Sequence, residues 1–279
     1  MVRSRLQDDE GAKAFLEEAT EELGESPLRN AFVSCYLQSS SGNKKEGGIE
    51  FVHKSFGEFL CAERIKEAFE IWTKPGDLRN IKFYVRKNRL QDELYDLFGF
   101  GCMPPEVITF LFNLINVELT KARKNGVYEE AIARYNTLFE RLYLFFWDWC
   151  RGHFINGNIE NSPFNTRESI PLRIAQRLDS IIPVSVGQLQ VDVYTGINVL
   201  IILMKLHQNV PDIDFDLCKD PVSEELTPKT LSKLISYVNV LGSSVFVELV
   251  GKYLNQAQLE KANLRRVNLG GAKLMDSKL

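Results

Sequence analysis

Residues 1–75 show three successive patterns of apolar positions. An acidic stretch at 11–25 places its apolar side chains at helical spacing. Segments 31–38 and 49–56 are enriched in aromatic and β-branched residues and flank a loop rich in Gly and Ser, which predicts a β-hairpin. Helical spacing returns at 54–72, where the apolar stripe consists of Phe56, Phe59, Leu60, Ile65 and Phe69. Helix, hairpin and helix together predict a winged-helix-like N-terminal segment.

Residues 76–253 follow helical periodicity almost throughout. Residues 103–126 open with prolines and end with basic residues and a glycine, which suits the start and the end of a helix. Residues 127–152 carry a wide apolar face made by Ile132, Tyr135, Leu138, Phe139, Leu142, Phe145, Phe146 and Trp149. Residues 227–242 open with an N-cap threonine and a proline. We predict an all-α middle domain of about six helices, and hence a mainly α chain.

The C-terminal residues repeat with a period of five. Leucine recurs at Leu254, Leu259, Leu264, Leu269, Leu274 and Leu279. A small or medium residue stands two positions before each leucine from Leu259 onward, at Ala257, Ala262, Val267, Ala272 and Ser277. Neither a helix nor a strand keeps a five-residue period on one face, so these residues require a different repeating structure.

This register resembles the pentapeptide-repeat family, whose chains wind into a right-handed quadrilateral β-helix. The resemblance implies that each repeat forms one side of the coil. It also implies that the leucine and the small residue two positions before it both point inward. The implied repeat core consists of Ala257, Leu259, Ala262, Leu264, Val267, Leu269, Ala272 and Leu274. We therefore expect residues 254–279 to form a short, truncated array of little more than one coil.

A second resemblance concerns residues 49–65, IEFVHKSFGEFLCAERI. They are similar to the end of the NACHT module of STAND signal-transduction NTPases, where such a segment joins the wing of a winged helix to its last helix. The matching positions are Phe51, His53, Phe56, Glu58, Phe59, Leu60 and Ala62, and Cys61 replaces an expected alanine. The resemblance implies that His53 contacts the phosphates of bound ADP. A histidine that only ends a strand and caps the next helix fits the residues equally well.

The chain has no GxxxxGK[ST] motif, the loop that cradles nucleotide phosphates. We therefore expect no ATP hydrolysis and no cofactor in this chain. The resemblance places ATP or ADP and Mg²⁺ in an upstream NTPase domain of a parent protein. The chain is accordingly interpreted as a C-terminal fragment of a bacterial, cyanobacterial-type NACHT protein with pentapeptide repeats.

Composition suits a globular, cytoplasmic protein. Hydrophobic residues make up 44% of the 279 residues, and the net charge of −3 gives no field that steers toward nucleic acid or an anionic membrane. The longest apolar run, Val199–Met204, is far shorter than the roughly 20 residues of a membrane span. The 5 cysteines lie far apart without a CxxC, so we expect buried thiols in a reducing cytosol and no metal site.

Two weaker signals, an aspartate-rich segment and two isolated histidines, have structural interpretations. Alternating aspartates at 212–216 resemble the start of an EF-hand loop, but the required glycine and glutamate are missing, so we expect a solvated acidic loop. His153 and His207 stand alone in the sequence and are interpreted as structural residues.

These patterns predict a non-catalytic relay that passes nucleotide state through the helical domain to a repeat surface for protein partners or self-assembly. The alternative is a DNA-related module, either a DNA-binding winged helix or a DNA-mimicking pentapeptide protein. Charge argues against both, because residues 254–279 hold 5 cations and 2 carboxylates while residues 8–25 are acidic. Nucleic acid and membrane are therefore not expected as partners. An enzyme whose site is scattered along the sequence stays open as a third reading.

Overall fold

The computed structural model divides the chain into two compact units, Met1–Ala62 and Glu63–Leu279. Helix α3, Lys54–Thr73, begins in the first unit and ends in the second. The structure describes residues 37–39, 49–51, 54–76, 82–154, 169–179, 186–213, 215–217, 219–223, 225, 227, 230–242 and 244–254. The domain boundaries expected at 75 and 253 remain predictions.

The described part of the first unit contains a two-stranded antiparallel sheet. Strand β1, Leu37–Ser39, pairs with strand β2, Ile49–Phe51, and Leu37 stands opposite Phe51. This pairing agrees with the predicted hairpin, although each strand has only 3 residues. The helix predicted at 11–25 lies outside the described residues, so the winged-helix arrangement remains a prediction.

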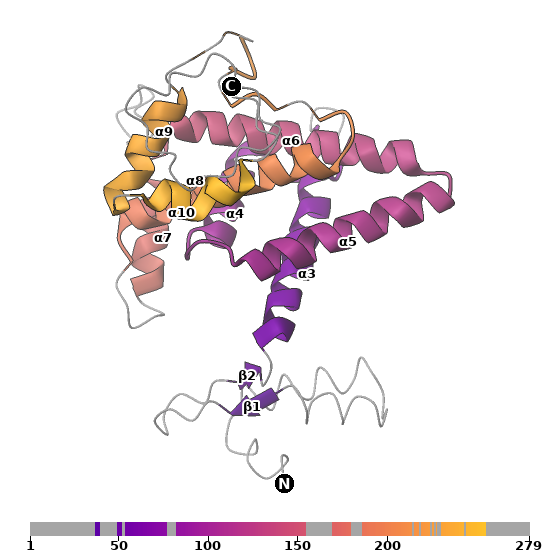
Figure 1. The fold of residues 1–279 in the computed structure, drawn as a ribbon, viewed down its shortest axis with the longest axis horizontal. Coiled ribbons are helices and arrows are strands. Elements are labelled where there is room, and N and C mark those ends of the chain that lie inside the picture. The colour runs from indigo at the N-terminus through magenta and orange to yellow at the C-terminus, as the bar shows by residue number, and fades with distance from the viewer. Residues whose placement is uncertain are drawn as a thin grey trace. The chain divides into compact units, whose positions relative to one another are not determined.

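The described part of the second unit is helical (Figure 1). After α3 the chain forms α4 (Lys87–Phe98), α5 (Pro105–Lys124), α6 (Tyr128–Cys150), α7 (Ile170–Asp179), α8 (Gln188–Asn209), α9 (Thr230–Val238), η1 (Asn239–Leu241), α10 (Val245–Val250) and η2 (Gly251–Tyr253). The prediction that this part of the chain is mainly helical is therefore confirmed. Helix α9 begins at Thr230, three residues after the threonine that was expected to cap it.

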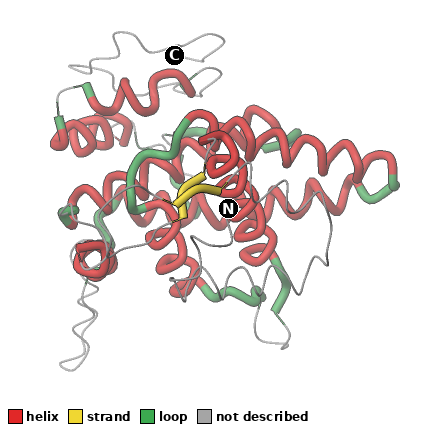
Figure 2. The backbone as a smooth tube through the Cα atoms, turned by 90° about the horizontal axis from the view of Figure 1, so that it is seen from below, coloured by secondary structure: helices red, strands yellow, loops and turns green. Residues whose placement is uncertain are grey.

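Helices α5 and α6 form a long antiparallel pair joined by a tight turn (Figure 1 and Figure 2). Pro105 stands in the first turn of α5, and basic side chains occupy its last turn. Gly126 has a φ of 76°, the left-handed conformation that glycine adopts readily after a helix end. The predicted apolar face of α6 is confirmed, because all of its residues are buried.

Helix α8 is the central helix of this unit and contacts α4, α6 and α7. Its side chains from Val191 to Leu206 are buried almost throughout. By length and composition α8 could cross a membrane, but 78% of its most apolar window is buried inside the protein. The apolar run Val199–Met204 is shorter than the buried part of α8. Asn198 interrupts the run of apolar residues, but it is itself buried, so the buried surface continues past it.

A glycine allows α6 and α8 to approach closely. A Cβ atom added to Gly196 would lie 2.1 Å from Cε2 of Trp149, well inside any real contact distance. The obstructing atoms belong to an indole ring that is itself buried, so the ring has little room to move aside. Only glycine fits at this position in α8.

We predict that Gly196→Ala lowers the free energy of unfolding by about 1–3 kcal/mol or more, because the added methyl overpacks the contact between α6 and α8. Urea denaturation followed by circular dichroism measures the change. The matched control is Gly101→Ala, whose added Cβ would meet nothing within 4 Å. An equal loss in both variants would contradict a close contact at Gly196.

Candidate functional site

The residues of the NACHT-like motif lie on β2 and on the first half of α3. The side chains of Phe56 and Phe59 are half-buried, and Leu60 is 37% exposed. Farther along the same predicted stripe, Ile65 and Phe69 are buried. The apolar stripe of α3 is thus buried in its second half and only partly covered in its first.

Glu58 is the acidic member of this motif. Its side chain is 8% exposed, and its Oε1 lies 3.1 Å from Nζ of Lys54, one helical turn earlier. Ion pairs at this spacing stabilise a helix. Phe51 is described only as backbone of β2, and His53 lies outside the described residues, so its contact with nucleotide remains a prediction.

The predicted repeat core from Ala257 to Leu274 also lies outside the described residues. The leucine ladder begins at Leu254, which is described and is fully buried. The two elements before it, α10 and η2, contact α8. Nε2 of Gln208 on α8 donates a hydrogen bond to the backbone oxygen of Tyr253 at 3.1 Å. The point at which the ladder begins is therefore held against the helical core.

Asp192 on α8 is a carboxylate with only 1% of its surface exposed. The hydroxyl of Tyr95 on α4 donates to its Oδ1 at 2.5 Å, and the hydroxyl of Tyr237 on α9 donates to its Oδ2 at 2.6 Å. Nε1 of Trp149 on α6 donates to the same Oδ2 at 2.9 Å. These donors satisfy both carboxylate oxygens, and they connect α4, α6 and α9 to α8.

The environment of Asp192 shifts several pKa values. Burial raises the pKa of its carboxyl, while the hydrogen bonds from the three donors act in the opposite direction. Burial first, and proximity to Asp192 second, raise the pKa values of the Tyr95 and Tyr237 hydroxyls and of the nearby Cys150 thiol. The hydroxyls and the thiol therefore keep their protons at neutral pH, as a structural network requires.

Asn198 lies on the same helix as Asp192 and is also 1% exposed. Its Nδ2 donates to the backbone oxygens of Phe98 at 3.0 Å and Gly101 at 2.7 Å, and its Oδ1 accepts from the backbone N–H of Met103 at 2.8 Å. Both ends of the amide are used. These bonds fix the connection between α4 and α5 onto α8.

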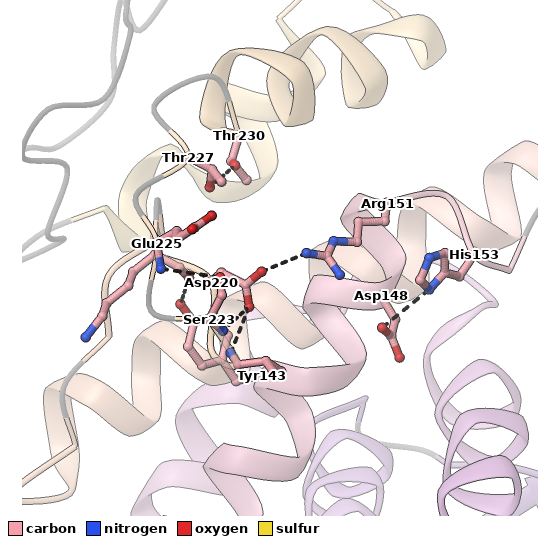
Figure 3. A network of polar contacts seen from close by, with 11 residues as sticks. Tyr143, Asp148, Arg151, His153, Asp220, Ser223, Glu225, Thr227 and Thr230 are labelled. Carbon is pink, nitrogen blue, oxygen red and sulfur yellow. Dashed lines mark hydrogen bonds and ion pairs between the residues drawn. The ribbon is translucent and has the colours of Figure 1, made fainter.

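A second polar network lies at the end of α6 (Figure 3). Asp220 accepts hydrogen bonds from Nη2 of Arg151 at 2.7 Å and from the backbone N–H groups of Val222 at 2.7 Å and Ser223 at 3.2 Å. The bond from Val222 contributes most to a lowered pKa of the Asp220 carboxyl. This arrangement fixes the loop before α9 to the end of α6.

Segment 212–217 differs from the solvated loop that was expected. Its aspartates alternate with Ile213, Phe215 and Leu217, and these three side chains are buried. The ring of Phe215 meets that of Tyr143 edge to face, with the ring centres 5.2 Å apart. The sequence interpretation considered the acidic half of this two-residue alternation and missed the apolar half.

The two described histidines outside the motif have partners within the chain. Nδ1 of His153 lies 3.4 Å from Oδ1 of Asp148 (Figure 3), and Nδ1 of His207 lies 2.6 Å from the backbone oxygen of Ile213. Both contacts suit structural roles. Among the described residues, no three His, Cys, Asp or Glu side chains gather as metal ligands would.

A surface groove of about 930 Å³ lies between the end of α3, the second half of α5 and the first half of α6. Its lining includes the charged side chains Glu70, Lys74, Glu118, Lys121, Glu130 and Arg134. The apolar side chains of Ile71 and Val127 also line it and are exposed. No motif in the sequence indicated this groove, because three separate helices must pack before it exists.

Comparison with known families identifies the C-terminal ladder. Residues 251–279 match the family model described as "Pentapeptide repeats (8 copies)". The chain therefore contains pentapeptide repeats, as the leucine register predicted. No curated protein and no solved structure gives a significant match to the chain.

We predict that Tyr237→Phe destabilises the protein by about 1–3 kcal/mol, because buried Asp192 loses a hydrogen-bond donor. Urea denaturation at neutral pH measures the loss. Tyr84→Phe removes the same hydroxyl from a ring that is 51% exposed, and its effect should stay within about 0.5 kcal/mol. A loss no greater than that of the control would show that the Tyr237 bond contributes nothing to stability.

Proposed function

We propose that this chain is a non-catalytic helical module that presents a pentapeptide-repeat surface to protein partners. The observation that carries the proposal is the repeat match at 251–279, directly after helices that are packed on α8. A solenoid exposes a continuous surface for binding, and a fixed starting point gives that surface a defined orientation. The buried Leu254 and the bond from Gln208 to Tyr253 support such a starting point.

The proposal extends to signal relay. The resemblance of residues 49–65 to the end of a NACHT module supports an origin in a bacterial, cytoplasmic signal-transduction NTPase. In that protein an upstream domain would hold ATP or ADP with Mg²⁺, and His53 would respond to the bound phosphates. Helices of the second unit would then pass the nucleotide state to the repeats.

Substitution within the ladder tests the interaction surface. Leu264→Asp places an unpaired charge at a position that the repeat register assigns to the interior, which costs several kcal/mol if the coil is folded. We expect loss of hydrogen-exchange protection over residues 255–279 and loss of proteins that co-purify with the wild-type chain.

The matched control introduces the same side chain one residue later. Arg265→Asp falls at an outward position of the register, so protection over 255–279 should persist. If the two variants keep equal protection and the same co-purifying proteins, the repeats are not the interaction surface.

A measurement of nucleotide binding tests the proposed signal relay. Because the chain has no phosphate-cradling loop, we predict no saturable binding of ATP or ADP by calorimetry at about millimolar concentration, with or without Mg²⁺. Binding in the micromolar range would mean that the chain holds a nucleotide site of its own, and the proposed division of labour with an upstream domain would be wrong.

A further inference from the structure

The groove between α3, α5 and α6 offers apolar surface to solvent. Ile71 at the end of α3 is 39% exposed, and Val127 at the start of α6 is 43% exposed. The small side chains of Ala122 and Ala133 complete this part of the lining. Exposed apolar side chains gathered in one groove and rimmed by charges are typical of a protein-binding site, whereas isolated ones are not.

Several charges of the groove are neutralised within the chain. Nζ of Lys66 lies 2.8 Å from Oε2 of Glu118 and also pairs with Glu70. Arg134 pairs with Glu118 from the other side of the groove. The carboxylates that α3 and α5 contribute to the lining are therefore already compensated and do not repel an anionic ligand strongly.

The two lysines of the groove have no such compensation. Among the described residues, neither Lys74 nor Lys121 has a carboxylate within ion-pair distance. Lys121 is followed in the last turn of α5 by two further cations. The opposing unpaired carboxylates are Glu129 and Glu130 in the first turn of α6. The rim therefore keeps an excess of unpaired positive charge.

The segment between α3 and α4 adds to this charge. The backbone N–H of Tyr84 donates to the oxygen of Lys74 at 2.9 Å, so the two residues are neighbours. Lys82, Tyr84 and Arg86 are exposed, while Val85 between them is buried. Nζ of Lys74 lies 5.2 Å from the ring centre of Tyr84. Lys74 therefore lies against an exposed aromatic ring beside the groove, and the exposed cations Lys82 and Arg86 stand within two residues of that ring in the sequence.

The buried side chain of Arg141 holds this segment in place by hydrogen bonds to the backbone. Its side chain is 8% exposed and donates to the backbone oxygens of Trp72 and Val85. Its guanidinium carbon lies 4.2 Å from the ring centre of Phe83. Burial lowers the pKa of Arg141 to about 10, so it remains charged at neutral pH. The cationic segment is therefore fixed before any partner arrives.

The unpaired cations stand out against the rest of the described surface. Elsewhere most exposed basic side chains pair with carboxylates, among them Lys87 with Asp148, Arg89 with Glu93, Arg151 with Asp220, Arg173 with Asp92, and Arg177 with Asp96. The chain as a whole has a net charge of −3. A local positive excess on an acidic protein favours approach of an anionic partner to this face.

We propose that the groove is a second interaction site, which binds an amphipathic helix of a partner protein whose apolar stripe is flanked by Asp and Glu. The stripe covers Ile71 and Val127, and the flanking carboxylates pair with Lys74 and Lys121. An apolar helix face in a groove between helices is a common recognition mode. Ile71 and Val127 form the apolar floor of the groove. This floor distinguishes the site from a nucleic-acid surface, where basic and stacking groups dominate.

The test uses the full chain and a synthetic helical peptide of about five turns, with leucines at i, i+3, i+4 and i+7 spacing and glutamates beside them. We expect saturable binding by fluorescence anisotropy with a dissociation constant below about 100 μM at low salt, weakening as salt rises. A peptide with lysines in place of the glutamates, and a scrambled glutamate peptide, should bind at least about tenfold more weakly.

Substitutions locate the binding site. The double variant Lys74→Glu with Lys121→Glu should weaken binding by about tenfold or more, and Val127→Asp should do the same through the apolar floor. Lys233→Glu on α9 reverses an exposed charge that does not belong to the lining and should leave the dissociation constant unchanged. Thermal melts of each variant establish that all of them are folded.

Three results would overturn the proposal. The first is absence of binding by the glutamate peptide, or equal binding by the scrambled one. The second is competition by oligothymidine as effective as that by the peptide, which would make the site a general polyanion surface. The third is concentration-dependent self-association of the chain that Val127→Asp abolishes, which would make a second copy the occupant.

Discussion

A carboxylate inside the helical unit constrains the positions of the helices around it. Asp192 is almost inaccessible to water. The free-energy cost of burying its carboxylate is therefore offset by the three donors that reach it from α4, α6 and α9. An ionised group without such partners would cost several kcal/mol at this depth. The three donor helices must therefore present a hydroxyl or an indole N–H at one point, and that requirement fixes their placement on α8 more narrowly than apolar packing alone.

The same helix carries the constraints that position the rest of the described unit. Asn198 fixes the link from α4 to α5, and Gly196 lets Trp149 approach closely enough to reach Asp192. Tyr237 ties α9, and through it the last helices of the described chain, to the same point. The bond from Gln208 on α8 to the backbone oxygen of Tyr253 likewise holds the chain to this helix just before Leu254, where the leucine ladder begins.

Local pattern predicted what depends on local spacing. The start and end of α5, the buried face of α6 and the five-residue register all follow from side chains close together in the sequence. The sequence did not indicate Asp192 or Asn198, because their partners lie far along the chain and a polar residue in an apolar stretch looks like an interruption. The groove was not predicted from the sequence for a related reason. Its lining comes from three helices, and no single one of them shows a concave surface. The buried side of segment 212–217, by contrast, was readable from its alternation.

Charge placement connects the two proposed interaction surfaces. The repeats hold more cations than carboxylates in their sequence, and the rim of the groove keeps unpaired lysines although the chain is acidic overall. Unpaired surface cations contribute little to folding, so stability does not account for their concentration at these places. At the two proposed surfaces they would act on encounter, because a positive face on an acidic protein orients an incoming acidic partner before any apolar contact forms. In the groove, affinity would then depend on the exposed apolar side chains of Ile71 and Val127, from which a partner would displace water. Ionic strength should therefore act mainly on the association rate, while changes in the apolar floor act mainly on dissociation.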